Sequence, residues 1–223
     1  GIWLFRQPQF FPYKPWTKWA EYTRVSIKPL IYMGMSVALA TMTEFGLISG
    51  AALMAGTLGV VSLAAHQIAL QILSFSWCIA YGFAQATSIM VSNQYGSNRN
   101  KKTIIHIARN GLILATVSSA FIGLMFSINP QWLSQLFAKP GDALFAELVD
   151  ILPSLMLVAA ACFIVDAWQL IGLNILRGMK IVFAPALITG VGYILAGLPA
   201  AWYLMQTFQL QGIWMGIGLG LAV

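Results

Sequence analysis

The chain has 223 residues, of which 59% are hydrophobic and only 8% are charged. An ordinary soluble domain carries about 25% charged residues, so this composition excludes a soluble globular protein and indicates an all-α, polytopic membrane protein. A net charge of +6 would suggest a nucleic-acid partner in a soluble protein. Here the basic residues lie between apolar spans, where they indicate topology, and we expect no nucleic-acid partner.

Residues 1–28 are expected to hold the end of a preceding span and a loop at the cytoplasmic membrane surface. Gly1–Phe5 is apolar, lacks an initiator Met and is too short for the core of a signal peptide. The loop Arg6–Lys28 mixes five basic residues with Trp and Tyr, as segments at the membrane interface do. Residues 29–223 are then expected to form the membrane domain, in contact with the lipid bilayer.

The first complete span, Pro29–Leu53, contains one charged side chain, Glu44. At about 1.5 Å per residue, Glu44 lies about 24 Å from Lys28, inside a hydrocarbon core of about 30 Å. A carboxylate there costs roughly 2.5 to 3.5 kcal/mol on insertion scales and usually faces a bundle interior or a wet cavity. Glu44 is therefore a candidate for an ion or substrate pathway. The alternative is a buried structural hydrogen bond.

After a turn at Met54–Gly59, the second span, Leu63–Val91, carries a polar stripe. At 100° per residue, eight polar positions fall within about 100° of one another on the helix. They are Gln67, Gln71, Ser74, Cys78, Tyr81, Gln85, Ser88 and Ser92. The stripe indicates a face turned away from lipid, so Gln67, Gln71 and Tyr81 are candidates for a substrate cavity. A hydrogen-bonded seam between helices is the alternative.

A polar basic loop is expected over Asn93–Asn110 and a third span over Gly111–Ile128. Small residues recur every four positions in that span, which lets a neighbouring helix approach closely. They are Ala115, Ser119, Gly123 and Ser127. A second loop, Asn129–Asp150, carries mainly acidic charges.

The fourth span, Ile151–Leu173, again contains one charged residue, Asp166, and leaves the membrane at Arg177. Counted in the same way, at about 1.5 Å per residue from the nearest flanking basic residue, the depth of Asp166 differs from that of Glu44 by about 8 Å. Helix tilt can compensate for such a difference. We therefore predict that the two carboxylates share a site. Phe45 and Phe163 are their sequence neighbours, and aromatic faces suit cationic ligands, although isolated apolar aromatics more often belong to a core.

The fifth span begins at Pro185 and ends near Trp202 and Tyr203, placed as an interfacial belt. The sixth begins after Gln211 and carries a doubled GxxxG pattern at Gly212, Gly216 and Gly220. The residues from there to Val223 are too few to cross a bilayer, so the last helix is expected to be truncated.

Eleven of the twelve Lys and Arg residues fall on one side of this arrangement, in residues 6–28, 99–109 and 177–180, and Lys139 alone falls on the other. By the positive-inside rule, the eleven are cytoplasmic. Cys78 and Cys162 lie inside apolar spans, so no disulfide framework is expected. His66 and His106 lack the spacing of a transition-metal site, and we expect neither a transition metal nor a cofactor.

Three stretches of the chain are distinctive: LMAGTLGVVSLAAHQIAL (Leu53–Leu70), VDAWQLIGLNILRGMK (Val165–Lys180) and GLPAAWYL (Gly197–Leu204). They resemble the C-terminal half of a multidrug and toxic compound extrusion (MATE) transporter of the NorM-like branch. The resemblance implies one six-helix lobe, about helices 7 to 12, of a two-lobe transporter in a bacterial inner membrane. Its N-terminal lobe would be absent here.

The family further implies export of cationic, amphipathic drugs against an inward Na⁺ or H⁺ gradient. By position, Glu44 and Asp166 match its cation-binding carboxylates, with Na⁺ as one candidate ion, and Gln67 matches a polar cavity position. Without the family, two carboxylates in a low-dielectric cavity would still attract a monovalent cation or a proton. A cationic drug would compete for the same negative potential, which gives antiport.

Two other functions are alternatives. A lipid-linked saccharide flippase of the same superfamily would be expected to line its cavity with Arg and Lys, whereas every basic residue here can be assigned to a loop or interface. An intramembrane enzyme would hold two carboxylates within direct hydrogen-bond reach inside short glycine-framed Asp motifs, which Glu44 and Asp166 lack. The sequence therefore favours a transporter that is not an enzyme.

Overall fold

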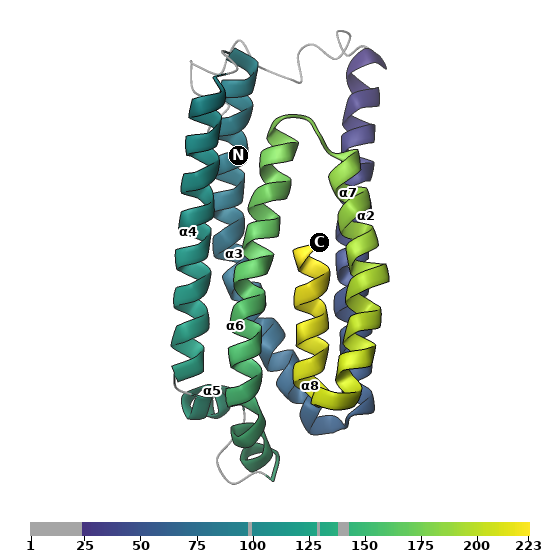
Figure 1. Ribbon diagram of the computed structural model, residues 1–223, viewed down its shortest axis with the longest axis vertical. Helices are drawn as coiled ribbons and strands as arrows, with labels where there is room; N and C mark the ends of the chain where they lie inside the picture. Colours follow the sequence, from purple (N-terminus) through teal and green to yellow (C-terminus); the bar gives the residue numbers. More distant parts are fainter. Residues whose placement is uncertain (1–23, 98–99, 129, 138–142) are drawn as a thin grey trace, which may run out of the picture.

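The computed structural model describes residues 24–97, 100–128, 130–137 and 143–223 as an elongated bundle of helices (Figure 1). No strand occurs within these ranges. The elements, in chain order, are α2 (Arg24–Thr57), α3 (Val60–Ser97), α4 (Lys101–Ile128), α5 (Pro130–Phe137), α6 (Ala143–Gly178), α7 (Phe183–Val191), the π-helical segment η4 (Gly192–Gly197) and α8 (Leu198–Ala222). The predicted all-α membrane bundle is confirmed. The segment predicted for residues 1–23 lies outside the described residues.

Five helical stretches of the described residues are long and apolar enough to cross a membrane, and they contain the predicted spans. The last stretch, Phe183–Ala222, reverses direction at Gln209, whose φ of 50° and ψ of −126° are not helical. Residues after Gln209 run back antiparallel to those before it, as the yellow end of the chain shows in Figure 1. The prediction of separate fifth and sixth segments is therefore confirmed.

Glycines set the contact between these last two segments. A Cβ at Gly216 would meet the backbone of Ala201, and one at Gly220 would lie 2.9 Å from Cα of Gly197. The predicted GxxxG face therefore packs directly against the preceding segment, because only hydrogen atoms separate the backbones. In α4, a Cβ at Gly123 would similarly lie 2.7 Å from Cβ of Ala160 on α6, so the predicted small-residue stripe is also a helix contact.

Both long loops expected from the sequence are largely helical. Residues 93–97 complete α3 and residues 101–110 open α4, where the side chain of Asn100 accepts a 3.1 Å hydrogen bond from the backbone N–H of Lys102. The loop expected over residues 129–150 contains α5 and the first turns of α6. Those predictions were wrong because hydropathy marks only the part of a helix inside the hydrocarbon. At 38 residues, α3 is about 57 Å long and extends well beyond it.

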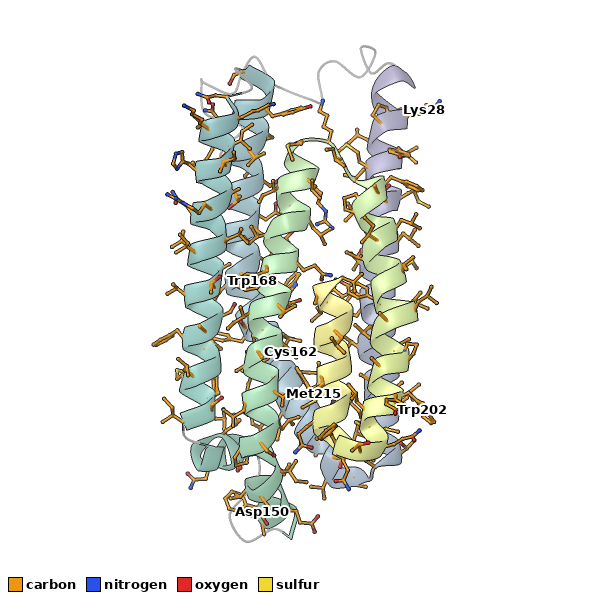
Figure 2. All side chains as sticks on the ribbon, viewed as in Figure 1. Lys28, Asp150, Cys162, Trp168, Trp202 and Met215 are labelled. Atoms are coloured by element: carbon orange, nitrogen blue, oxygen red, sulfur yellow. The ribbon has the colours of Figure 1, made fainter. Side chains whose placement is uncertain are left out.

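Helix α6 is the centre of the bundle, since α3, α4, α5 and α8 all pack against it, while α2 packs on α7, η4 and α8. Figure 2 places Lys28 and Asp150 at opposite ends, with Trp202 toward the Asp150 end. The basic end of α2 and the acidic start of α6 are therefore on opposite sides of the bundle, as the charge pattern predicts. Lys139 lies outside the described residues.

Candidate functional site

Glu44 and Asp166 approach one another inside the bundle. Asp166 lies on α6 and is only 6% exposed, while Glu44 on α2 is half-buried. The two carboxyl groups are near enough that a charge on one acts on the other. Hydropathy places both helices across the membrane, so this is a pair of acidic groups in a medium of low dielectric. The structure thus brings together the two residues for which the sequence predicted a shared site.

A tyrosine and a glutamine that the sequence analysis did not select complete the surroundings of the pair. Tyr193, on η4 and 1% exposed, donates a 2.5 Å hydrogen bond to Oε1 of Gln169 on α6. The charges of both Glu44 and Asp166 act on the Tyr193 hydroxyl. Gln169 follows Asp166 by three positions, which places the two side chains on one helical face. Oxygen atoms from α2, α6 and η4 therefore converge on one region.

One polar atom in this region has no partner. Nε2 of Gln169 is buried and donates no hydrogen bond, although the oxygen of the same amide accepts one from Tyr193. An unpaired buried amide donor costs about 1 to 3 kcal/mol. Since a tyrosine hydroxyl can donate or accept, the amide can turn to pair Nε2 with Tyr193 and present Oε1 instead. Gln169 is thus able to offer a second oxygen next to Asp166.

The charge count assigned Arg177 to a loop or interface, but the structure places it in a helix. It belongs to the last turn of α6, is half-buried, and lies close enough to Glu44 for their charges to attract. Its side chain borders a small cavity of about 10 Å³ between α2, α6 and α7, which Ser36 and Pro185 also line. The sequence predicts a surface position for Arg177 because the residue follows the end of an apolar span. A long side chain can instead turn back along its own helix.

The polar stripe of α3 lies elsewhere. Gln67, Gln71 and Tyr81 are exposed, whereas the opposite face of α3, including Ala65 and Ile72, is buried in the core. The structure therefore does not bring these three candidates to the carboxylate pair. It places them along an exposed polar surface. Contact of these polar side chains with lipid would be unfavourable, because lipid offers them no hydrogen-bond partners.

An aromatic pair interrupts this surface. The rings of Trp77 and Tyr81 stack with centroids 4.8 Å apart and an interplanar angle of 15°. The amide Nε2 of Gln85 donates a hydrogen bond to the Tyr81 hydroxyl, which fixes the ring from its polar side. Stacked aromatic faces attract cations through the ring quadrupole, so this part of the stripe suits a flat cationic ligand.

The two phenylalanines beside the carboxylates in sequence have different surroundings. Phe45 is 65% exposed on the outer face of α2. Phe163 is 1% exposed and packs edge-on against Trp214 with ring centroids 6.4 Å apart. Phe163 therefore contributes to the core and offers no face to a ligand, because its place on α6 turns it toward α8. His66 is also buried and lies edge-on to Trp214, with ring centroids 5.8 Å apart.

Weak sequence signals for the missed residues existed. Gln169 is the only amide within a helical turn after Asp166, and Tyr193 is a hydroxyl-bearing residue inside the glycine-rich run GVGYILAG. Arg177 carried no such signal, because a basic residue after an apolar span is ordinarily interfacial.

Comparisons with known proteins agree on one family. The MatE family model matches residues 34–203. The chain is 34% identical over 201 residues to a probable multidrug resistance protein NorM of Pseudomonas putida, covering 88% of this chain and 43% of the relative. It is 31% identical to the protein of that name in Pseudomonas syringae, covering 97% and 47%. The chain thus spans less than half the length of these relatives.

A solved structure gives an independent comparison of the fold. A MOP superfamily transporter from Pyrococcus furiosus superposes with a TM-score of 0.69 at 19% identity, covering 87% of this chain and 42% of the other. Together with the spans and the bacterial relatives, these matches identify a multi-pass protein of a bacterial inner membrane.

Proposed function

The chain belongs to the MatE family, and on that premise we propose that it is the C-terminal lobe of an exporter of cationic, amphipathic compounds driven by Na⁺ or H⁺. Residues 29–223 would form the lobe, and residues 1–28 would connect it to a preceding span. The observation that supports the proposal most directly is the approach of Glu44 and Asp166 within the membrane region.

The carboxylate pair would hold the coupling cation. Two ionised carboxylates in a low-dielectric region repel one another, and a bound Na⁺ or a proton relieves that repulsion. Oxygen ligands suit a hard cation, and Gln169 and Tyr193 add neutral oxygens to the two carboxylates. Arg177 would attract Glu44 when the cation is absent, so that a buried carboxylate always has a positive partner.

Substrate would bind at the exposed stripe of α3. Gln67, Gln71, Tyr81 and its stacked neighbour Trp77 would face the cavity that a second lobe completes. Because drug and coupling cation are both positive, each would weaken the binding of the other through the shared negative potential. Release of one on binding of the other is the basis of antiport. Phe45 would lie on the outer face, toward lipid or the second lobe.

The half-buried Arg177 argues against the alternative function, a lipid-linked saccharide flippase. A lipid-linked saccharide carries a pyrophosphate, so its transporter needs basic groups that face an open cavity. The charge of Arg177 instead attracts that of Glu44, and the small cavity that Arg177 borders has room for about one water. An exporter of cations therefore fits the lobe better. Since the family consists of transporters, the intramembrane enzyme is not proposed.

Efflux of ethidium from proteoliposomes tests the function. The full-length protein that contains this chain should expel ethidium when an inward Na⁺ or H⁺ gradient is imposed, and residues 1–223 alone should insert without transporting. Gradient-independent leakage at the level of empty liposomes would reject an exporter. Ethidium efflux by residues 1–223 alone would reject the requirement for two lobes.

A further inference from the structure

A groove of about 590 Å³ runs along the outer surface between α4 and α6, away from the carboxylate pair. It is lined by Arg109, Leu112, Ile113, Thr116, Val117 and Trp168. Figure 2 shows Trp168 on α6 where that helix faces α4. Apart from Arg109 and one hydroxyl, the lining is hydrocarbon and indole, so this is an open, apolar surface groove with one cation at its end.

Trp168 forms a defined wall of this groove. Its indole Nε1 donates a 2.7 Å hydrogen bond to Oγ1 of Thr116, and the hydroxyl of Thr116 in turn donates to the backbone O of Leu112 at 2.7 Å. The only polar atom of the indole is therefore satisfied across the two helices. Trp168 is nevertheless 50% exposed, so the apolar faces of its ring remain available to whatever fills the groove.

Arg109 lies at the depth of a lipid headgroup. Helix α4 has 28 residues and is about 42 Å long, which exceeds a hydrocarbon core of about 30 Å by about 12 Å. Arg109 follows Lys101 by about 12 Å, and every residue of α4 after Asn110 is uncharged. The excess length is therefore the basic start of the helix. Helix α4 starts at the end of the bundle where Lys28 also lies. Arg109 therefore marks the boundary between headgroups and acyl chains on that side.

Positive charge continues from Arg109 toward the start of α4. At 100° per residue, Lys102 lies about 20° from Arg109 on the helical wheel, whereas Lys101 lies about 80° away. Both lysines and Arg109 are exposed. Toward the membrane centre the same face continues with Ile113 and Thr116. This face of α4 thus carries two cations followed by an apolar groove about 10 Å long. That order complements a phospholipid, whose anionic headgroup is followed by apolar acyl chains.

We propose that this groove binds an anionic phospholipid of the cytoplasmic leaflet. Its phosphate contacts the guanidinium of Arg109, which is suited to paired hydrogen bonds with phosphate oxygens, and Lys102 contributes a second positive charge. One acyl chain lies along Ile113 and Val117 as far as the ring of Trp168. The site rests on topology and surface chemistry only, so it holds whether or not the lobe exports drugs.

Native mass spectrometry of the full chain tests the site. The purified chain is equilibrated with equal amounts of phosphatidylglycerol and phosphatidylcholine, and retained lipids are counted. We expect one retained phosphatidylglycerol. Arg109→Gln should lower the preference for phosphatidylglycerol about five-fold, as loss of one basic residue near an anionic membrane surface does. Lys101→Gln is the matched control, because it removes the same charge from the same end of α4 off the groove face.

A second variant separates the groove from surface charge. Ile113→Trp fills the groove at a side chain that is 52% exposed, so it should preserve helicity by circular dichroism while abolishing retention of the lipid. Equal retention of both lipids by the parent chain would overturn the proposal, as would equal effects of Arg109→Gln and Lys101→Gln. Undiminished retention by Ile113→Trp, or a dimer that excludes lipid from α4, would contradict the groove as the binding site.

Discussion

The hydroxyl of Tyr193 donates a 2.5 Å hydrogen bond to Oε1 of Gln169, which joins the π-helical segment η4 to α6 one turn beyond Asp166. A π-helix makes backbone hydrogen bonds one residue longer than an α-helix and is frequent at functional sites. Here it places a tyrosine within range of the charges of both Glu44 and Asp166. The carboxylate pair is therefore bordered by a neutral hydrogen-bonded pair whose orientation can reverse.

Neutral isosteres of the two carboxylates test their role as cation ligands. In the full-length protein, Glu44→Gln and Asp166→Asn keep shape and hydrogen-bonding capacity but remove the charge. Each should reduce gradient-driven ethidium efflux at least about 100-fold, because the loss of a buried charged contact costs about 3 kcal/mol or more. Membrane expression should stay near that of the parent.

Two outcomes would contradict that expectation. If both single variants retain Na⁺- or H⁺-driven efflux, the carboxylates do not carry the coupling cation. Loss of expression in both would favour a structural hydrogen-bonding role. Glu147→Gln serves as a control, since Glu147 is an exposed carboxylate at the start of α6.

Removal of the Tyr193 hydroxyl should weaken cation coupling without abolishing transport. Tyr193→Phe leaves the amide of Gln169 unpaired at both ends, and we expect a loss of about 1 kcal/mol in stability together with a several-fold higher Na⁺ or H⁺ concentration for half-maximal efflux. Tyr203→Phe, at a tyrosine that is 73% exposed, is the matched control. Equal effects of the two variants on the cation dependence would exclude Tyr193 from the site.

The close contact between the last two membrane segments predicts unequal effects of one substitution at two glycines. Gly216→Ala places a methyl group against the backbone of Ala201 and should destabilise the lobe by about 1 to 3 kcal/mol. Gly46→Ala meets nothing within 4 Å and should be neutral or stabilise α2 by up to about 1 kcal/mol. Thermal unfolding in detergent measures both, and an equal change in Tm would show that the packing at Gly216 is looser than described.

Cysteine labelling tests the orientation of the bundle. In a background without Cys78 and Cys162, a membrane-impermeant maleimide applied to intact cells should label Asp150→Cys and not Lys101→Cys. Both positions are exposed, and the first residues of α4 and of α6 lie at opposite ends of the bundle. Labelling at position 101 alone would invert the topology, and labelling at both would show that one of the two helices does not cross the membrane.

The membrane spans could be predicted from the sequence because hydropathy is a local property. Pro29–Leu53 and Ile151–Leu173 are both contained in observed helices, and the GxxxG glycines are in contact where expected. The helix ends could not be predicted in the same way. Residues 93–97 and 101–110 are polar enough to be taken for a loop, yet their backbone hydrogen bonds continue the helices in the interface, where water also solvates their side chains.

The candidate site was predicted in part, for a related reason. A charge inside an apolar span stands out against its neighbours, so Glu44 and Asp166 could be selected from the sequence. The amide of Gln169 and the hydroxyl of Tyr193 are far less unusual in a membrane helix and gained importance only from their contact. Phe163 precedes Asp166 by only three positions, but its ring packs against Trp214 of α8 and lies in the core, a contact that the sequence of α6 alone does not reveal.

By itself, the sequence determined that this chain crosses a membrane several times, which end of the bundle is basic, and that two carboxylates lie in the membrane. Each of these results follows from the free energy of placing a given side chain at a given membrane depth. Only the tertiary structure decided which groups meet. Glu44 comes from α2, Asp166 and Arg177 from α6, and Tyr193 from η4. Their convergence depends on how helices distant in sequence pack against one another, through close backbone contacts such as that between Gly216 and Ala201. No local property of a single segment determines that packing.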